Sequence, residues 1–390
     1  MVGGAGHVGA PLAIVLAHNG FPTLIHDLNV KAMETLASGQ LPFREDAAEP
    51  LLKEALAKRM LSFDSNPASL TGVPYVVVTI GTPIDEFHNP MLGVVQKCID
   101  ALLPHLSDDQ TIIMRSTVFP GVTEYVHNYL RAHGKRTHVA FCPERVVQGY
   151  SVRELQTLPQ IISGATPEAE ERAAKLFAKI APKLVRMQPK EAEFAKLISN
   201  AYRYIQFAAT NQFYTMCESA GVSYHSVLKG LKEDYPRLDG LPGPGFAAGP
   251  CLFKDTLQLA AYTNNTFGLG YAAMHVNEGL PAFLVNRMQA QYRLGEATVG
   301  ILGMAFKAES DDIRASLSYK LRKLLRYNAK AVISTDPFVT IDPELVPVEQ
   351  VISRSDVLVL GVPHAAYRDL DLRGKPLVDV WNFHRPSAAK

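Results

Sequence analysis

The amino-acid sequence predicts an α/β protein in which two doubly wound parallel-sheet domains are joined by a long central helical segment. Over residues 1–188, continuous Val/Ile runs alternate with amphipathic helical segments, the pattern of a parallel sheet covered on both faces. Residues 189–293 change to long helical periodicity, and residues 294–390 return to strands alternating with helices. We therefore expect three domains with these boundaries, the outer two built around sheets.

A glycine-rich turn near the start of the chain indicates what the first domain binds. The run Gly4–Gly9 has the spacing G-x-G-x-x-G and precedes an apolar helical segment. In a Rossmann domain these glycines permit a tight turn, close approach of a pyrophosphate to the helix N-terminus, and packing of the helix on the sheet. Asp27 ends the next strand, where a ribose hydroxyl is bound. The pattern predicts a Rossmann-like domain that takes NAD rather than NADP; the alternative is an apolar strand that ends in a solvated acid.

The first strand of this domain is short. Only Met1 and Val2 precede the glycines, although such a strand needs about five or six residues. We therefore expect the natural chain to begin a few residues upstream, and a strand of two residues to weaken NAD binding.

Polar or turn-forming tails follow three of the four strands expected in the first domain. The strands are expected at Pro22–Asp27, Pro74–Ile80, Thr111–Arg115 and His138–Phe141. The tails after the last three contain Thr82 and Pro83, Ser116 and Thr117, and Glu144 and Arg145. Because ligands of such sheets bind beyond the carboxyl ends of the strands, we expect these tails to line a site. Ordinary turn or capping chemistry is the alternative for the Ser and Thr residues.

Composition limits the classes of function. The chain has 390 residues, 47% hydrophobic and 20% charged, so it can bury two or three cores. A formal net charge of +1 gives no reason to expect a nucleic acid or an anionic membrane as partner. Four widely and irregularly spaced cysteines resemble neither a disulfide framework nor a zinc site, so we expect no metal and a reducing, cytoplasmic location. We expect neither a signal peptide nor a membrane span.

The central segment carries a polar pair on a long helical pattern. Lys196 and Asn200 are four residues apart, so they share one helix face and could point at one ligand. The alternative is that both belong to a solvated face. Further helices are expected at Thr256–Tyr262 and Gly270–Tyr292. A long apolar helix between two sheet domains predicts a homodimer formed through the central helices.

One cysteine lies in a glycine-rich loop, with a lysine and a carboxylate just behind it. Cys251 ends the run Gly243–Cys251 and is followed by Lys254 and Asp255. Glycines let backbone approach a ligand closely, the lysine could favour the thiolate, and the carboxylate could activate water. The sequence therefore predicts a site of covalent catalysis, and the alternative is a small buried apolar thiol.

The last domain lacks a G-x-G-x-x-G run, so a nucleotide must be bound there by other contacts. Lys307 and Arg314 are the candidates for phosphate binding, and surface charge is their alternative role. We expect a helix near Ser318–Tyr327 and strands at Val299–Met304, Ala331–Ser334, Val357–Leu360 and Leu377–Val380.

Taken together, these motifs resemble the nucleotide-sugar 6-dehydrogenase family, which includes UDP-glucose and UDP-N-acetylmannosamine dehydrogenases, and the resemblance spans essentially the whole chain. It implies an NAD-binding first domain, a central dimer-forming helix, and a C-terminal Rossmann-like domain that binds the UDP-sugar. It also implies oxidation of a C6 primary alcohol to a uronic acid through a Cys251 thiohemiacetal and thioester, with two NAD⁺ reduced per sugar.

The resemblance also implies roles for individual residues. The catalytic set is Cys251, Lys196 for the oxyanion, Asp255 with Thr117 and a water for proton transfer, Asn200 for orientation, and Glu144 for thioester hydrolysis. The cofactor-binding set is Gly4, Gly6, His7, Val8, Gly9, Asp27, Thr82, Pro83, Ser116, Thr117 and Lys254. The substrate-binding set is Glu144, Arg145, Lys196, Asn200, Gly245, Phe246, Phe306, Lys307 and Arg314.

The motifs do not identify which nucleotide sugar is the substrate. Lys254-Asp255 after the cysteine is similar to enzymes acting on UDP-glucose or GDP-mannose, whereas Cys142–Val146 and Val276–Pro281 look more like UDP-N-acetylhexosamine dehydrogenases. Pro250 replaces the histidine usual in the latter, and Ala247-Ala248 replaces a usual glycine pair, which leaves less room for backbone near the sugar. Two other classes remain as alternatives: a two-electron β-hydroxyacid-type dehydrogenase, and a non-catalytic nucleotide-sugar-binding relative.

Overall fold

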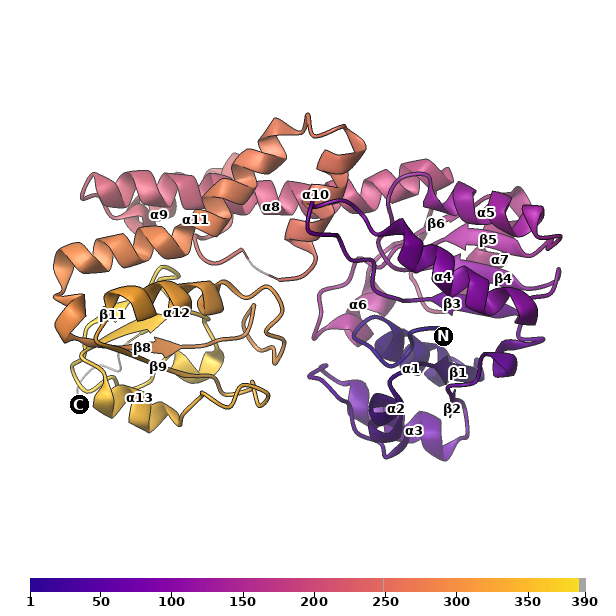
Figure 1. Cartoon of the computed structure of the whole chain (residues 1–390), viewed down its shortest axis with the longest axis horizontal. Coiled ribbons are helices and arrows are strands. Elements are labelled where there is room, and N and C mark those ends of the chain that lie inside the picture. The colour runs from indigo at the N-terminus through magenta and orange to yellow at the C-terminus, as the bar shows by residue number, and fades with distance from the viewer. Residues whose placement is uncertain (248, 386–390) are drawn as a thin grey trace. The chain divides into compact units, whose positions relative to one another are not determined.

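The computed structural model describes residues 1–247 and 249–385 (Figure 1). The chain divides into two compact units. Unit 1 comprises Met1–Ser199 with Ala261–Asn264, and unit 2 comprises Asn200–Ala260 with Asn265–Lys390. The predicted fold class, an α/β protein with two doubly wound sheets, is confirmed. The division into residues 1–188, 189–293 and 294–390 stays a prediction, because the two units meet within a central helix.

The sheet of unit 1 contains seven strands and one bridging residue. They are β1 Thr23–His26, β2 Leu61–Asp64, β3 Tyr75–Val78, β4 Thr111–Met114, β5 His138–Phe141, β6 Gln160–Gly164 and β7 Leu184–Arg186. The neighbour pairs β1–β2, β3–β4, β4–β5 and β6–β7 are parallel. The β5–β6 pair is antiparallel, so the expected wholly parallel sheet is corrected at this pair. Strands β2, β6 and β7 were not predicted.

Val2 occupies the first-strand position of this sheet. It forms parallel bridges to both His26 and Val78, so it joins the β1–β2 pair to β3. Its N–H donates to the Val77 carbonyl at 2.8 Å, and its own carbonyl accepts from the Thr79 N–H at 2.8 Å. The chain thus enters the glycine-rich turn from the centre of the sheet, as the fingerprint requires.

Helices cover both faces of the unit 1 sheet. They are α1 Gly9–His18, α2 Val30–Ala37, α3 Ala48–Ala57, α4 Leu92–Leu102, α5 Val122–Ala132, α6 Ser151–Thr157 and α7 Pro167–Phe177. Alternate strand residues enter opposite cores: Val77 packs in the core with α1, α3, α6 and α7, whereas Val76 and Val78 pack in the core with α4 and α5. This alternation is why the Val/Ile runs are continuous.

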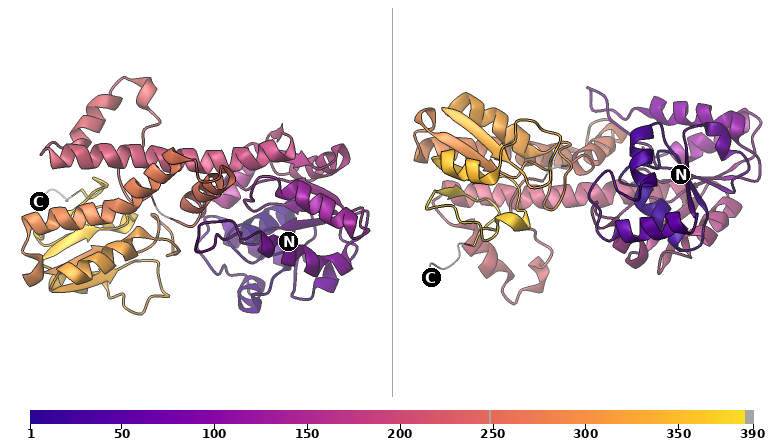
Figure 2. Two further views of the ribbon diagram at one scale, coloured as in Figure 1. Left: turned by 45° about the horizontal axis from the view of Figure 1, so that its top comes forward. Right: turned by 90° about the horizontal axis from the view of Figure 1, so that it is seen from below.

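The central segment is helical. Its helices are α8 Pro189–Ser219, α9 Tyr224–Lys232, α10 Leu252–Tyr262 and α11 Gly268–Gln291 (Figure 2). The α8 helix is continuous for 31 residues and belongs in part to each unit. The expected helices at Thr256–Tyr262 and Gly270–Tyr292 are therefore α10 and α11, and α10 starts directly after Cys251.

Unit 2 contains a four-stranded parallel sheet in the order β11-β10-β8-β9. The strands are β8 Thr298–Leu302, β9 Ala331–Thr335, β10 Val357–Leu360 and β11 Leu377–Val378. The helices α11 and α12 (Leu317–Asn328) share one core with this sheet, and α13 (Val348–Arg354) shares the other. Five short 3₁₀ helices complete the described elements: Pro67–Leu70, Leu103–His105, Pro236–Leu238, Leu294–Glu296 and Ala365–Tyr367.

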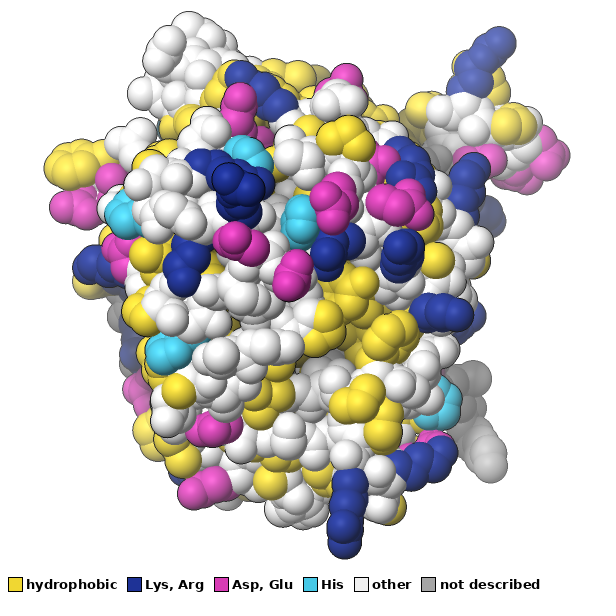
Figure 3. Space-filling view, turned by 90° about the vertical axis from the view of Figure 1, so that its right-hand side faces the viewer, with side chains coloured by type: hydrophobic (Ala, Val, Ile, Leu, Met, Phe, Trp, Pro, Cys, Tyr) yellow, Lys and Arg dark blue, Asp and Glu magenta, His cyan; other side chains and the backbone are white. Residues whose placement is uncertain are grey.

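The described part of the chain shows mixed surface charge and no feature of a membrane span or a metal site. Figure 3 shows basic and acidic side chains interspersed over one face of the molecule, in line with the net charge of +1. Within residues 1–247 and 249–385, no helix is long and apolar enough to cross a membrane. In the same part of the chain, no group of three or more His, Cys, Asp or Glu residues could hold a metal ion.

Candidate active site

The glycine-rich turn of unit 1 has the shape that a dinucleotide needs. A Cβ on Gly4 would lie 2.7 Å from the Met1 carbonyl oxygen, and one on Gly9 would lie 2.6 Å from the Gly4 Cα. Only glycine fits at these two positions, because real Cβ atoms do not approach backbone so closely. A Cβ on Gly6 would meet nothing nearer than 4.0 Å. Gly6 thus faces open space beside the start of α1, where a pyrophosphate can approach the backbone.

Asp27 lies beside this turn, directly after β1. Its Oδ2 accepts the Ala5 N–H at 2.9 Å, and its Oδ1 accepts the Asn29 N–H at 2.9 Å. Each carboxylate oxygen keeps a further lone pair, so Asp27 can also accept ribose hydroxyls. The His7 ring lies 4.1 Å from the Phe43 ring, and its Nδ1 is 3.1 Å from the Gln148 amide nitrogen. Val8 is the N-cap residue of α1. The turn and Asp27 together fit NAD.

The polar tails of β3 and β4 contact each other. The Thr82 hydroxyl donates to the Thr117 carbonyl at 2.5 Å, and Pro83 and Ser116 adjoin these two residues in the chain. This contact places two of the predicted tails along one edge of the sheet, as expected for strands that end together.

The tail of β5 holds a buried ion pair that sequence reasoning missed. The Arg115 guanidinium donates to Oε2 of Glu144 at 2.6 Å and to the side-chain oxygen of Gln160 at 2.6 Å. The other oxygen of Glu144 accepts the Val146 N–H at 2.7 Å. Arg145 donates to the Pro159 carbonyl, and burial lowers the pKa of its guanidinium. Glu144 is therefore held in one orientation by Arg115, whose position at the end of a strand was the only signal in the sequence.

Lys196 and Asn200 both lie in α8, one turn apart, and both side chains are largely buried. No hydrogen bond or ion pair to the Lys196 ammonium is found among the residues that the structure describes. The Asn200 amide donates to Oδ2 of Asp255 at 2.6 Å. Asp255 is completely buried in the first turn of α10, and its Oδ1 lies 3.3 Å from the Lys254 ammonium. The Asn200–Asp255 contact thus joins α8 to the first turn of α10 within unit 2.

Cys251 is the exposed one of the four free cysteines; Cys142 is buried, and Cys98 and Cys217 are half-buried. Cys251 stands directly before the first residue of α10, at the N-terminus of that helix. Burial raises the pKa of Cys142 to about 12 and that of Cys98 to about 11. Exposure and position thus single out Cys251 among these thiols.

Two ring contacts shape the cysteine loop, defined as residues 243–251. A Cβ on Gly245, where φ is +151°, would lie 2.1 Å from the Trp381 ring. A Cβ on Gly249, where φ is +105°, would lie 2.5 Å from the Phe306 ring. Phe246 and Ala247 are buried beside them, and Ala248 lies outside the described residues. The loop can therefore follow this path only with glycine at these two positions.

One basic side chain of unit 2 interacts with this loop, and a second lies beside Phe306. Arg314 interacts electrostatically with Cys251, and its guanidinium forms a bidentate ion pair with Asp312 at 2.6 and 3.0 Å. The hydrogen bonds that Arg314 donates to Asp312 raise the pKa of its guanidinium. The Lys307 ammonium lies 6.0 Å from the centre of the Phe306 ring. Unit 2 thus gathers Asn200, Cys251, Lys254, Asp255, Phe306 and Arg314, whereas unit 1 holds the glycine turn, Asp27, Thr82, Thr117, Glu144 and Lys196.

A dinucleotide-binding domain joined in one chain to a second Rossmann-like sheet domain defines the class as an NAD-dependent dehydrogenase. Comparison with known sequences gives the family. The NAD binding domain, central domain and UDP binding domain of the UDP-glucose/GDP-mannose dehydrogenase family match residues 1–181, 190–278 and 300–386. The chain belongs to the UDP-glucose/GDP-mannose dehydrogenase family, as the sequence motifs predicted.

Relatives of this family resemble the chain over nearly its full length. An NDP-N-acetyl-D-galactosaminuronic acid dehydrogenase from Ralstonia nicotianae is 28% identical, over 99% of this chain and 96% of the relative. A solved UDP-D-ManNAc dehydrogenase from Pyrococcus horikoshii is 26% identical with a TM-score of 0.91, covering 98% of this chain and 95% of that chain. A solved UDP-glucose dehydrogenase from Pyrobaculum islandicum, 24% identical with a TM-score of 0.90, covers 98% and 94%; this likeness shows the fold alone.

Proposed function

We propose that this protein oxidises the C6 primary alcohol of a UDP-sugar to a carboxylate by a four-electron reaction through a covalent intermediate on Cys251. The observation that carries the proposal is the setting of this thiol. Cys251 is exposed directly before α10, Arg314 lies within electrostatic reach, and the buried Asp255 follows one helical turn later. Covalent catalysis requires a nucleophile, and a nearby cation and a proton acceptor can activate it.

The proposed chemistry balances in four steps. Loss of a hydride from C6 and of a proton from its hydroxyl gives an aldehyde, and the thiol of Cys251 adds to the aldehyde carbon to form a thiohemiacetal. Loss of a second hydride and proton gives a thioester, and water then breaks the C–S bond to release the uronate and the free thiol. Two NAD⁺ molecules, bound one after the other, would each accept one of the two hydrides.

The other predicted site residues of the two units also have proposed roles. The Lys196 ammonium stabilises negative charge on the C6 oxygen, and Asn200 orients the bound intermediate. Asp255 accepts protons together with Thr117 and a water. Its carboxylate is fixed by the amide of Asn200 at 2.6 Å. The ion pair with Arg115 holds Glu144 in one orientation, which suits a base for thioester hydrolysis.

The substrate proposal rests on unit 2 and on the relatives. We propose that Lys307 and Arg314 bind the diphosphate, that Gly245, Phe246 and Phe306 line the UDP-sugar site, and that Arg145 also contacts substrate. Relatives that oxidise N-acetylated nucleotide sugars match nearly the whole chain, so we propose a UDP-N-acetylhexosamine as the first substrate to test and UDP-glucose as the second. Four free thiols suit a cytoplasmic location.

We also propose a homodimer formed through α8. Large apolar side chains stay exposed along this helix at Ile198, Tyr202, Phe213 and Met216. At about 100° per residue these four positions fall within an arc of roughly 60°, so they form one stripe. An exposed apolar stripe of this kind fits the same stripe of a second copy related by two-fold symmetry.

Stoichiometry tests the function. Purified protein is mixed with NAD⁺ and a panel of UDP-N-acetylmannosamine, UDP-N-acetylglucosamine, UDP-glucose, UDP-galactose and GDP-mannose, and NADH formed per sugar consumed is measured. Two NADH per sugar with one member supports the proposal and names the substrate. One NADH per sugar would replace it by a two-electron dehydrogenase, and no NADH with any member would replace it by a binding role.

A further inference from the structure

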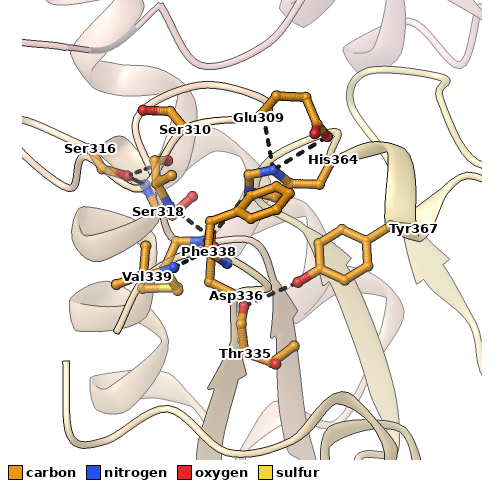
Figure 4. Close-up of polar contacts among 12 residues, drawn as sticks. Glu309, Ser310, Ser316, Ser318, Thr335, Asp336, Phe338, Val339, His364 and Tyr367 are labelled. Carbon is orange, nitrogen blue, oxygen red and sulfur yellow. Dashed lines mark hydrogen bonds and ion pairs between the residues drawn. The ribbon is translucent and has the colours of Figure 1, made fainter. Parts of the chain in front are cut away.

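We propose that the buried pair Asp336 and His364 is a positioning device that holds the 303–316 loop, which carries Phe306 and Lys307, in the conformation that binds the nucleotide diphosphate. This inference rests on the proposed function, because it concerns the same UDP site. Neither residue lies in a sequence motif that predicted function. Both side chains are completely buried in unit 2, beyond the carboxyl end of its sheet (Figure 4).

Asp336 follows β9 and accepts five hydrogen bonds. Its Oδ2 accepts the N–H groups of Met304 and Ala305 at 2.6 and 2.9 Å and lies 3.1 Å from His364 Nε2. Its Oδ1 accepts the N–H groups of Phe338 and Val339 at 2.8 and 3.1 Å. Burial alone would raise the pKa of Asp336, but these hydrogen bonds outweigh it, and the pKa is lowered. The carboxylate therefore stays ionised and holds the residues just before Phe306.

Comparison with Asp27, the equivalent acid of unit 1, shows that Asp336 does not have the ribose-binding role of an acid at this position. Asp27 and Asp336 each follow the second strand of their Rossmann-like sheet. Asp27 is only partly buried and accepts two N–H groups, which leaves lone pairs for a ribose. Asp336 is fully buried and its oxygens are saturated. It cannot receive a ribose hydroxyl, so its carboxylate serves the protein's own loop.

His364 links this carboxylate to the far side of the loop. Its Nδ1 accepts the Glu309 N–H at 3.0 Å, so Nδ1 carries no proton and Nε2–H donates to Asp336. In return, the Glu309 carboxylate accepts the Ala365 N–H at 2.8 Å. Glu309 has left-handed backbone, with φ of +55°, which costs free energy outside glycine and is sustained by this clamp. Figure 4 shows the His364 ring between Glu309 and Asp336.

These hydrogen bonds therefore connect the segments that follow three strands at the start of the 303–316 loop. Met304 and Ala305 follow β8, Asp336 follows β9, and His364 follows β10. Phe306, the next residue of the tied segment, places its ring against Gly249 of the cysteine loop. Lys307 adjoins it in the chain. Loss of the Asp336–His364 link should therefore loosen Phe306 and Lys307 while the sheet itself persists.

Binding of UDP alone, by isothermal titration calorimetry on the full chain, tests the inference without turnover. His364→Ala should weaken UDP binding about tenfold, the effect of losing one or two buried hydrogen bonds. His364→Gln, which keeps a donor near Asp336, should recover part of the loss. Tyr367→Phe is the matched control, because it removes a buried hydroxyl that bonds the Thr335 carbonyl at 3.4 Å and the Gly303 backbone but leaves the Asp336–His364 link intact. It should bind UDP like the wild type.

Glu309→Ala provides a second variant. The Glu309 side chain is partly exposed, so its removal should leave the protein folded. It should weaken UDP binding several-fold with an unchanged melting temperature. NADH fluorescence on the same samples should show unaltered NADH binding in every variant, and turnover should show a raised KM for the sugar with less change in kcat. UDP binding equal to wild type in both folded His364→Ala and Glu309→Ala would overturn the inference. Absence of UDP binding to the wild-type chain would instead overturn the proposed function.

Discussion

Asn211 of α8 and Asn277 of α11 form a side-chain hydrogen bond of 2.9 Å in a site where both residues are fully buried. Asn211 also brackets Gly245: its amide donates to the Gly245 carbonyl at 3.0 Å, and its carbonyl accepts the Gly245 N–H at 2.9 Å. The Asn277 amide donates to the Tyr204 carbonyl at 3.0 Å. The start of the cysteine loop is thereby bonded to two helices, and its buried backbone groups are satisfied.

Replacing Asn211 by Ala should therefore destabilise unit 2. The Gly245 N–H and carbonyl would be left buried without partners, which costs about 1–3 kcal/mol per group. We expect the free energy of unfolding, measured in urea, to fall by at least this amount, and turnover to fall because Cys251 lies in the same loop. Gln212→Ala, on the exposed side of the same helix, is the control. Equal stability of the two variants would show that the hydrogen bonds between Asn211 and Gly245 do not stabilise unit 2.

The cysteines should differ in their reactivity toward iodoacetamide. Alkylation requires the thiolate, and a raised pKa lowers its fraction at any given pH. With a pKa of about 12, Cys142 is about 10⁻⁴ ionised at pH 8, and Cys98, with a pKa of about 11, about 10⁻³. Peptide mass spectrometry at pH 8 should therefore find Cys251 labelled first, with Cys98 and Cys142 labelled only as the pH rises toward 11 or on unfolding. Early labelling of Cys142 would contradict its burial.

Changing Cys251 to Ala should abolish the four-electron reaction. Without the thiol the aldehyde has no covalent partner, so NADH formation should stop after at most one hydride per sugar, a loss of at least about 10³-fold in steady-state rate. Cys217→Ala, a half-buried cysteine of α8, should keep the wild-type rate. Full turnover in Cys251→Ala would favour a two-electron dehydrogenase.

Asp27 should decide the preference for NAD. Replacing it by Ser removes the acceptor of the ribose hydroxyls and a negative charge that repels a 2′-phosphate. We expect the KM for NAD⁺ to rise about 10- to 100-fold, as for loss of a hydrogen bond to a charged group, and the NADP⁺/NAD⁺ ratio of kcat/KM to increase. Asp64→Ser, at the end of the adjacent β2, should change neither value. An unchanged KM in the Asp27 variant would place the ribose elsewhere.

Features of the fold and the site that depend on residues close together in the chain could be predicted from the sequence, and features that depend on distant residues could not. The strands at His138–Phe141 and Val357–Leu360 have their predicted bounds, because apolar runs buried on both faces are visible locally. Strand β6 was missed because its antiparallel pairing with β5 is a tertiary contact. In the site, spacing pointed to Cys251 and its neighbours. The Asn211–Asn277 bond joins residues far apart in the chain, and only the packing of two helices brings their amides together.

The α8 stripe should control assembly. Tyr202 and Met216 are about 60% exposed, so a monomer would leave large apolar side chains in water, whereas a dimer would bury them. Tyr202→Asp with Met216→Asp would place four carboxylates in an apolar interface, and we expect the molar mass from light scattering to fall from about two chains to one. Met91→Asp, an equivalent change at an exposed methionine of unit 1, should leave the mass unaltered. A dimer that survives the double substitution would show that another surface holds the copies together.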